Sequence, residues 1–218
     1  MLSRVFTVNR GQLDEAIALV EMVEPPPPPG VLLPGAPGID VSHWQGVIDW
    51  QAVAADGQQF AYLKATDPEF GAGKIDGKFE ANRLGCRTAG VLWGAYHFFR
   101  PLYGAYSQAE DFLRALAGDW GDLRPALDVE YGFPTEAQMR IWLERIESAT
   151  GKRPIIYTRA SFWNEIGNPP LGDYGLWVAS YRENHPILPA GWQDYLIWQY
   201  TDRGSVAGIV PVDQNRWG

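Results

Sequence analysis

From Gly38 onward, short runs of apolar residues alternate with segments whose apolar residues recur every three or four positions. The runs predict buried strands, and the wider spacing predicts amphipathic helices. The first five predicted strands span 38–44, 59–66, 91–99, 124–131 and 153–158; the predicted helices span 49–57, 76–90, 107–119 and 135–151, with a short turn at 161–167. We expect Ser107 and Thr135 to cap helix starts, and Gly90 and Gly151 to end helices.

After residue 167 the alternation changes. The segments 176–181, 195–200 and 205–215 are strand-like, with no room for full helices between them. Repeated strand-helix units predict a parallel sheet with helices packed outside it. Eight strands in about 180 residues predict an α/β closed barrel of TIM-like type, shortened by loss of helices near its C-terminal end. The alternative is an open doubly wound sheet, but no glycine-rich phosphate loop follows the first strand.

The stretch before the barrel divides at five consecutive prolines, Pro25–Pro29. Prolines in a row favour a stiff, extended spacer. We therefore predict an N-terminal arm with a short amphipathic helix at 1–23, a proline-rich linker at 24–37 and a barrel domain at 38–218. Because a lone helix of this length is marginal in water, the arm is expected to dock on its own domain, on a partner or on a second copy.

Composition excludes some classes of partner. The net charge of −8 argues against nucleic acid or an anionic membrane, because either favours a basic surface. No run of about 18 apolar residues is present, so membrane insertion is not expected. The ten tryptophans and ten tyrosines can fill a core or form the flat surfaces on which sugars stack.

Two acids, Asp128 and Glu130, stand two positions apart in the fourth predicted strand. Alternation places both on one face, while Leu127, Val129 and Tyr131 share the other. The apolar face suits the helices outside a barrel, so the acids are expected to face its interior, near the C-terminal end of the strand where such barrels build active sites. Carboxylates about 6.6 Å apart at the backbone disfavour each other's ionisation. One is then expected to hold a proton near neutral pH while the other stays charged.

Further acids are expected at the same end of the barrel. Asp40 stands in the first strand and Asp213 in the last, and these strands are neighbours in a closed barrel. A purely structural role is the alternative, in which the acids cap turns or Lys64 pairs with Asp128 and Glu130.

Other candidate groups point to no metal or cofactor. With three histidines and one cysteine, a metal site rich in nitrogen or sulphur is not expected, although an all-oxygen cation site stays open. For His43 and His97 we favour a structural role over the alternative, in which they line the mouth of the barrel. We interpret Cys86 as a residue that packs in the core.

Seven motifs taken together resemble glycoside hydrolase family 25, the muramidases of Chalaropsis type found in bacteria, fungi and phage endolysins. In chain order they are "GIDVSHWQG", "YLKAT", "GAYHFFRP", "LDVE", "IIYT", "LWVASY" and "WQYTDRGSVAGIVPVDQN". The resemblance implies a barrel of five strand-helix units followed by three strands. It also implies hydrolysis of the β-1,4 bond between N-acetylmuramic acid and N-acetylglucosamine in peptidoglycan.

The resemblance also implies roles for individual residues. Glu130 matches the general acid, and Asp128 matches a nucleophile or the group that steadies the substrate's acetamido oxygen. Asp40 and Asp213 match supporting acids. The substrate-binding set that we predict consists of Tyr62, Lys64, Tyr96, Trp177 and Trp198.

One departure concerns the second strand, which family members commonly continue as "KATEG". Here it continues as "KATDPEF", and Asp67 followed by Pro68 is expected to redirect the loop and alter the shape of the cleft. Two alternatives stay open: a non-catalytic glycan-binding or phage structural module, and a hydrolase of another N-acetylated glycan such as chitin.

The first residues lack the uninterrupted apolar core of a secretory signal. We therefore expect a phage or prophage lysin that is made in the cytoplasm and acts on the cell wall, released by a holin or carried on a virion. Export by another route is the alternative.

Overall fold

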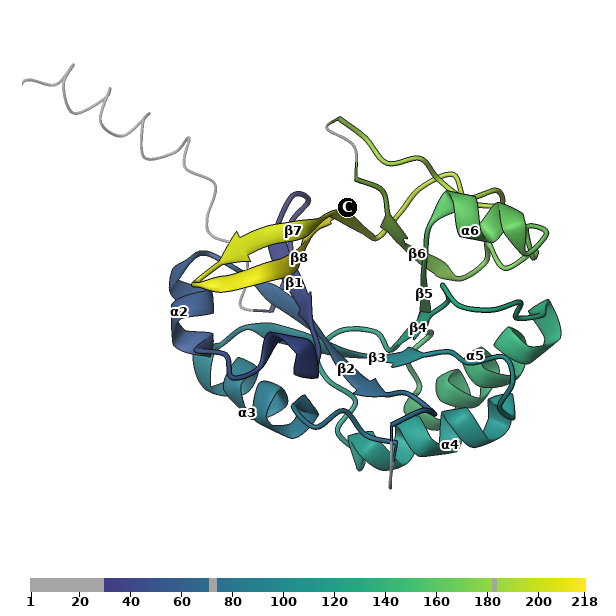
Figure 1. The fold of residues 1–218 in the computed structure, drawn as a ribbon, viewed down its shortest axis with the longest axis horizontal. Helices are drawn as coiled ribbons and strands as arrows, with labels where there is room; N and C mark the ends of the chain where they lie inside the picture. Colours follow the sequence, from purple (N-terminus) through teal and green to yellow (C-terminus); the bar gives the residue numbers. More distant parts are fainter. Residues whose placement is uncertain (1–29, 71–73, 182–183) are drawn as a thin grey trace, which may run out of the picture. The chain divides into compact units, whose positions relative to one another are not determined.

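The computed structural model describes residues 30–70, 74–181 and 184–218. Its strands form a closed barrel in chain order, β1 to β8. Figure 1 shows the helices outside this ring of strands. The strands are β1 (Pro37–Val41), β2 (Phe60–Thr66), β3 (Leu92–Phe98), β4 (Ala126–Asp128), β5 (Ile155–Thr158), β6 (Gly175–Ala179), β7 (Ile197–Val206) and β8 (Ile209–Trp217).

The direction of the strands changes only at the last one. Strands β1 to β7 pair with one another in parallel, and β8 is antiparallel to both β7 and β1. Pairing of β8 with β1 closes the ring and sets Asp40 opposite Asp213. The predicted α/β barrel with five strand-helix units and three final strands is therefore confirmed.

The final segment departs from the prediction. Residues 205–215, expected as one strand-like segment, contain the end of β7, a two-residue turn and most of β8. The turn residues Ala207 and Gly208 both have positive φ, 49° and 82°. This geometry matches the twist of a tight β-hairpin.

The α-helices follow the predicted pattern closely: α2 (Trp50–Ala55), α3 (Phe79–Ala89), α4 (Ala105–Leu116), α5 (Glu136–Thr150) and α6 (Ala160–Glu165). The first strand is shorter than predicted, because η1 (His43–Gln45), a single turn capped by Ser42, begins after Val41. Thr135 caps α5, and Gly90 and Gly151 end α3 and α5 in the left-handed conformation, as predicted. The Ser107 cap is wrong, because α4 begins earlier and buries Ala105 on the same face as Ala109 and Phe112.

Alternation along the strands separates two layers of core. The outer layer lies between strands and helices and includes Leu127 and Val129, while the inner layer fills the barrel. The inner layer is rich in aromatic residues: Phe60, Tyr62, Tyr157 and Trp177 with the smaller Leu123, Ala126, Ile155 and Ile197. Tyr131 does not join the outer layer as predicted, because β4 has ended three residues before it, and its side chain is exposed.

The start of the barrel also differs slightly from the prediction. Residues 32–37, assigned to the linker, belong to the barrel: Leu32 packs on the inner layer, and the Gly35 N–H donates to the Trp217 carbonyl at 2.8 Å. The predicted arm and the polyproline run lie outside the described residues.

Candidate active site

A pocket opens among the strands of the barrel and is lined by Asp40, Tyr96, Asp128, Glu130, Tyr157, Trp177, Gln199 and Asp213. The four carboxylates predicted from the sequence therefore line one pocket. Asp40 comes from β1, Asp213 from β8, and Asp128 is the last residue of β4. The fold thus brings together acids that are up to 173 positions apart in the chain.

Glu130 lies beyond the end of β4. The backbone between the two acids stays extended and bonded to β5: the Val129 N–H donates to the Tyr157 carbonyl at 2.9 Å, and the Thr158 hydroxyl donates to the Val129 carbonyl at 2.8 Å. Asp128 is buried at 5% exposure, whereas the Glu130 side chain is 31% exposed. One acid therefore lies deep in the pocket, and the other lies at its rim.

Asp40 and Asp213 share a proton. Asp40 Oδ2 accepts hydrogen bonds from Gln199 Nε2 at 2.9 Å and Asn215 Nδ2 at 2.8 Å. Burial raises the pKa of Asp40 to about 6, although the two hydrogen bonds act to lower it. Burial, followed by the negative charge of Asp40, raises the pKa of Asp213 to about 8. At neutral pH Asp213 therefore holds the proton and donates it to the Asp40 carboxylate.

Asp128 and Glu130 form the second coupled pair. Burial, followed by the charge of Glu130, holds the pKa of Asp128 well above its usual range. Burial also raises the pKa of Glu130, but Arg159 and Lys64 act against it, and the Arg159 guanidinium lies 3.8 Å from the Glu130 carboxylate. Asp128 Oδ1 has no hydrogen-bond partner among the described residues. The expected repulsion is therefore present, and the pKa values of both carboxyls lie above their usual range.

The base of the pocket is aromatic. Trp177 packs against Tyr157 at 4.8 Å and Tyr96 at 6.2 Å between ring centroids, and its Nε1 donates to Asn215 Oδ1 at 2.8 Å. The Tyr157 hydroxyl donates to Gln199 Oε1 at 2.9 Å. This network fixes the two amides that hold Asp40.

Sequence reasoning missed Tyr157, Gln199 and Asn215. All three lie in motifs that were identified in the sequence. Tyr157 belongs to "IIYT" and pairs with Asp128 in the register of β4 and β5, and Gln199 and Asn215 belong to the last motif. Their amide and hydroxyl groups are common in strands, so only the closed ring shows that they converge.

Three predicted substrate-binding residues do not line the pocket. Trp198 points into the outer layer and donates through Nε1 to the Ser180 carbonyl at 2.6 Å, because its inward neighbours on β7 are Ile197 and Gln199. Tyr62 lies in the inner layer against Trp177 at 4.6 Å, and its hydroxyl donates to the Arg124 carbonyl. Lys64 instead binds Asp67, with Nζ to Oδ2 at 3.2 Å.

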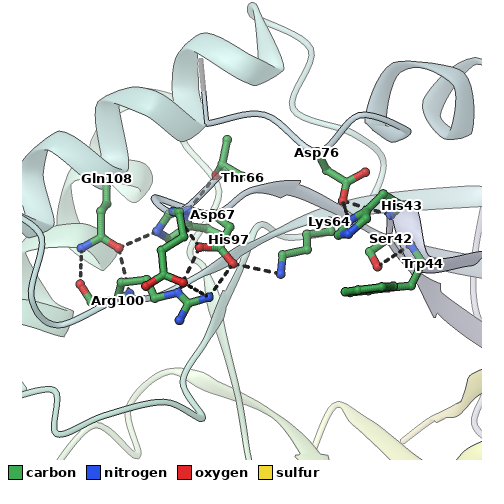
Figure 2. Close-up of polar contacts among 11 residues, drawn as sticks. Ser42, His43, Trp44, Lys64, Thr66, Asp67, Asp76, His97, Arg100 and Gln108 are labelled. Atoms are coloured by element: carbon green, nitrogen blue, oxygen red, sulfur yellow. Dashed lines mark hydrogen bonds and ion pairs between the residues drawn. The ribbon is translucent and has the colours of Figure 1, made fainter. Parts of the chain in front are cut away.

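Asp67 organises a polar network with Lys64 and Arg100, which Figure 2 shows. It is buried at 2% exposure and accepts from Lys64 and from Arg100, whose Nε and one terminal nitrogen lie 3.0 and 3.1 Å from its two oxygens. Lys64 Nζ also lies 4.4 Å from the centroid of Phe98. Asp67, the residue at which the chain departs from the family motif, therefore holds Lys64 of β2 and Arg100, which follows β3.

His43, His97 and Cys86 do not line the pocket. His97 is buried between the Thr66 hydroxyl at 2.7 Å and Gln108 Oε1 at 2.9 Å, and burial lowers its pKa to about 4. His43 Nδ1 lies 2.7 Å from Asp76 Oδ2 outside the pocket (Figure 2). Cys86 is fully buried, and burial raises the pKa of its thiol.

Within the described ranges, 30–70, 74–181 and 184–218, no three histidine, cysteine or acidic side chains gather as metal ligands would. In the same ranges, no helix has the length and apolar character needed to cross a bilayer.

Comparison with known proteins agrees with this geometry. A sequence model of glycosyl hydrolases family 25 matches residues 39–209. The chain is 36% identical to Lysozyme M1 of Streptomyces globisporus over 203 residues, covering 84% of this chain and 68% of that protein. It is 27% identical to the N,O-diacetylmuramidase of Chalaropsis sp over 194 residues, covering 78% of this chain and 90% of that enzyme. The bacterial lysozyme from Streptomyces coelicolor superposes with a TM-score of 0.73 at 32% identity, over 84% of this chain and 92% of that one.

Proposed function

The chain belongs to glycosyl hydrolases family 25 and is a peptidoglycan hydrolase of the muramidase type, and we propose that Glu130 and Asp128 perform its chemistry. The substrate bond is the β-1,4 link between N-acetylmuramic acid and N-acetylglucosamine. The observation that supports the residue roles most strongly is the convergence of four carboxylates on one pocket. Glycoside hydrolysis needs one carboxyl group to protonate the leaving oxygen and one anion to stabilise an oxocarbenium-like state.

We assign proton donation to Glu130 because it lies at the pocket rim, where a bound glycosidic oxygen can reach it. The deeper Asp128 takes the anionic role, either as nucleophile or as the partner of the substrate's own acetamido group. Positive charge that develops on the sugar favours the ionised form of Asp128. The developing charge therefore favours an ionised Asp128 beside a protonated Glu130, the arrangement that the reaction needs.

Asp40 and Asp213 support this pair. Their shared proton keeps one net negative charge on the β1–β8 side of the pocket at neutral pH. At neutral pH that charge lies on Asp40, and it opposes ionisation of Asp128. The four groups together thus retain protons that isolated carboxyls would lose.

The reaction is proposed to retain the anomeric configuration. Glu130 gives its proton to the departing oxygen, an intermediate forms with Asp128 or with the acetamido oxygen, and Glu130 then takes a proton from the water that opens the intermediate. The first reducing sugar released should therefore be the β anomer, which proton NMR of fresh product detects.

The decisive experiment uses purified cell walls. Glu130→Gln should lower the release of new reducing ends by about a hundredfold or more, in line with the loss of a general acid, while the far-ultraviolet circular dichroism spectrum stays unchanged. Asp128→Asn should be similarly impaired. Wild-type activity in folded Glu130→Gln protein would remove Glu130 from the mechanism.

The alternatives weighed from the sequence are not favoured. A non-catalytic module has no need for four carboxylates in one pocket. Activity on chitin is separated by comparing products from chitin and peptidoglycan. Phage or prophage origin and the route to the cell wall stay predictions.

A further inference from the structure

Trp44 is an exposed aromatic side chain on a firmly held turn. Its side chain is 81% exposed, although it follows directly on the strand that carries Asp40. Ser42 caps the turn by accepting from the Trp44 N–H, and Gln45 Oε1 accepts from the Ser42 N–H at 2.9 Å. An exposed indole on a fixed backbone loses little conformational freedom when a ligand covers it.

The neighbouring imidazole adds to this support. His43 packs beside Trp44 with 4.7 Å between ring centroids and ring planes tilted by 36°. Both its backbone N–H and its Nδ1 contact Asp76 Oδ2, at 3.0 and 2.7 Å. Figure 2 shows Ser42, His43, Trp44 and Asp76 in this arrangement. The contacts of Ser42, His43 and Gln45 thus hold the turn that carries the exposed Trp44 ring, and none of these residues has a role in the proposed hydrolysis.

Trp44 forms one side of a groove of about 520 Å³. The turn after β1 supplies Trp44 and Val47, and the β7–β8 hairpin supplies Val210 and Pro211. Val47 is 89% exposed and Val210 is 69% exposed, so the apolar surface faces solvent from both sides. Polar atoms come from Gln45 and Asp49.

The same two chain segments lead to the catalytic acids. Asp40 lies four positions before Trp44, and Asp213 lies two positions after Pro211, where β1 and β8 pair. The groove therefore starts on the β1–β8 side of the barrel mouth. The catalytic pocket shares no lining residue with the groove, and a strand of many sugars extends beyond that pocket onto the surrounding surface.

The chemistry of the groove fits a sugar ring. A pyranose has an apolar face of C–H groups and an edge of hydroxyls, which match an indole with aliphatic neighbours and two polar side chains. None of the groove's lining residues is basic, which disfavours an anionic ligand. Taking the proposed muramidase function as given, we infer that the groove between Trp44 and the β7–β8 hairpin is a glycan subsite, which stacks a sugar of the same strand away from the scissile bond.

Kinetics on substrates of two lengths test this subsite. The substrates are long glycan strands, stripped of stem peptides by an amidase, and a tetrasaccharide of the same repeat. Trp44→Ala should raise KM for long strands by about tenfold, equivalent to one good aromatic contact, with kcat nearly unchanged and little effect on the tetrasaccharide. Trp44→Phe should recover most of the loss. Leu84→Ala, at an exposed apolar position on α3, is the matched control and should change neither substrate.

Binding without turnover separates this subsite from the proposed chemistry. Isothermal titration of long glycan strands into Glu130→Gln protein and into Glu130→Gln/Trp44→Ala protein should show about tenfold weaker binding for the double variant. Equal binding by the two proteins, or equal losses on long and short substrates, would overturn the subsite. Failure of Glu130→Gln to abolish turnover would instead count against the catalytic assignment alone, because the kinetic comparison of Trp44→Ala with wild type on long and short substrates does not use that variant.

Discussion

Replacing Asp213 by asparagine should stabilise the protein at alkaline pH. The carboxyl pKa of Asp213 lies at about 8 in the folded chain and at 3.8 in a free side chain. The folded chain holds the Asp213 proton more tightly than the unfolded chain does. The protonated carboxyl therefore adds its full contribution to the free energy of unfolding below pH 3.8, and this contribution is lost as pH rises from 3.8 to about 8. An amide at this position keeps an N–H for Asp40 and does not titrate.

The size of the effect follows from the shift. At about 1.4 kcal/mol per tenfold change in proton affinity, the cost in wild type reaches up to about 6 kcal/mol at pH 9, of which about 4 kcal/mol develops between pH 5 and pH 9. For a chain of this size, that corresponds to a difference in melting temperature on the order of 10 °C. Asp213→Asn should therefore melt well above wild type at pH 9 and closer to it at pH 5.

Calorimetry or urea unfolding at the two pH values measures this difference. Glu144→Gln is the matched control, because it removes an exposed acid on the surface of α5. A stability difference between Asp213→Asn and wild type that is the same at pH 5 and pH 9 would refute the shared proton of Asp40 and Asp213.

Two further predictions concern the polar groups outside the pocket. Asp67→Asn should lower the free energy of unfolding by about 3 kcal/mol in urea titrations, because it leaves the nearly buried Lys64 and Arg100 without the anion that they share. Glu69→Gln, which removes a half-exposed acid from the same Arg100, should cost under about 1 kcal/mol. Equal losses in the two variants would contradict the buried pairing. Gln108→Ala should cost about 2–3 kcal/mol, since His97 and the backbone of Arg100 lose buried hydrogen bonds, and a loss below about 0.5 kcal/mol would show that water replaces the amide.

The barrel was predictable because its signals are local and repeated. Apolar runs, amphipathic helices and the stops at Gly90 and Gly151 each depend on a few neighbouring residues, and eight strand signals in order leave few topologies. The start of α4 was misplaced because burial of Ala105 outweighs the preference of Ser107 for a cap. The turn at Ala207–Gly208 was missed because its first residue is an alanine with positive φ, which no turn rule favours.

The acids of the site were predictable from alternation and strand order, but their partners were not. Alternation placed Asp128 correctly, and it also places Glu130 although the strand ends before it. The position of Trp198 needed the register of β7, which a one-residue choice reverses. The raised pKa values of Asp128 and Glu130 depend on burial and on the position of Arg159, and neither is visible in a linear sequence.

Closure of the ring by β8 ties activity to translation of almost the entire barrel. Asp213 and Asn215 reach Asp40 only after the chain has passed both hairpin strands, so a chain that stops before Asp213 lacks the strand segment that pairs with β1. We therefore expect the product of such an early stop codon to have an open ring and no hydrolytic activity.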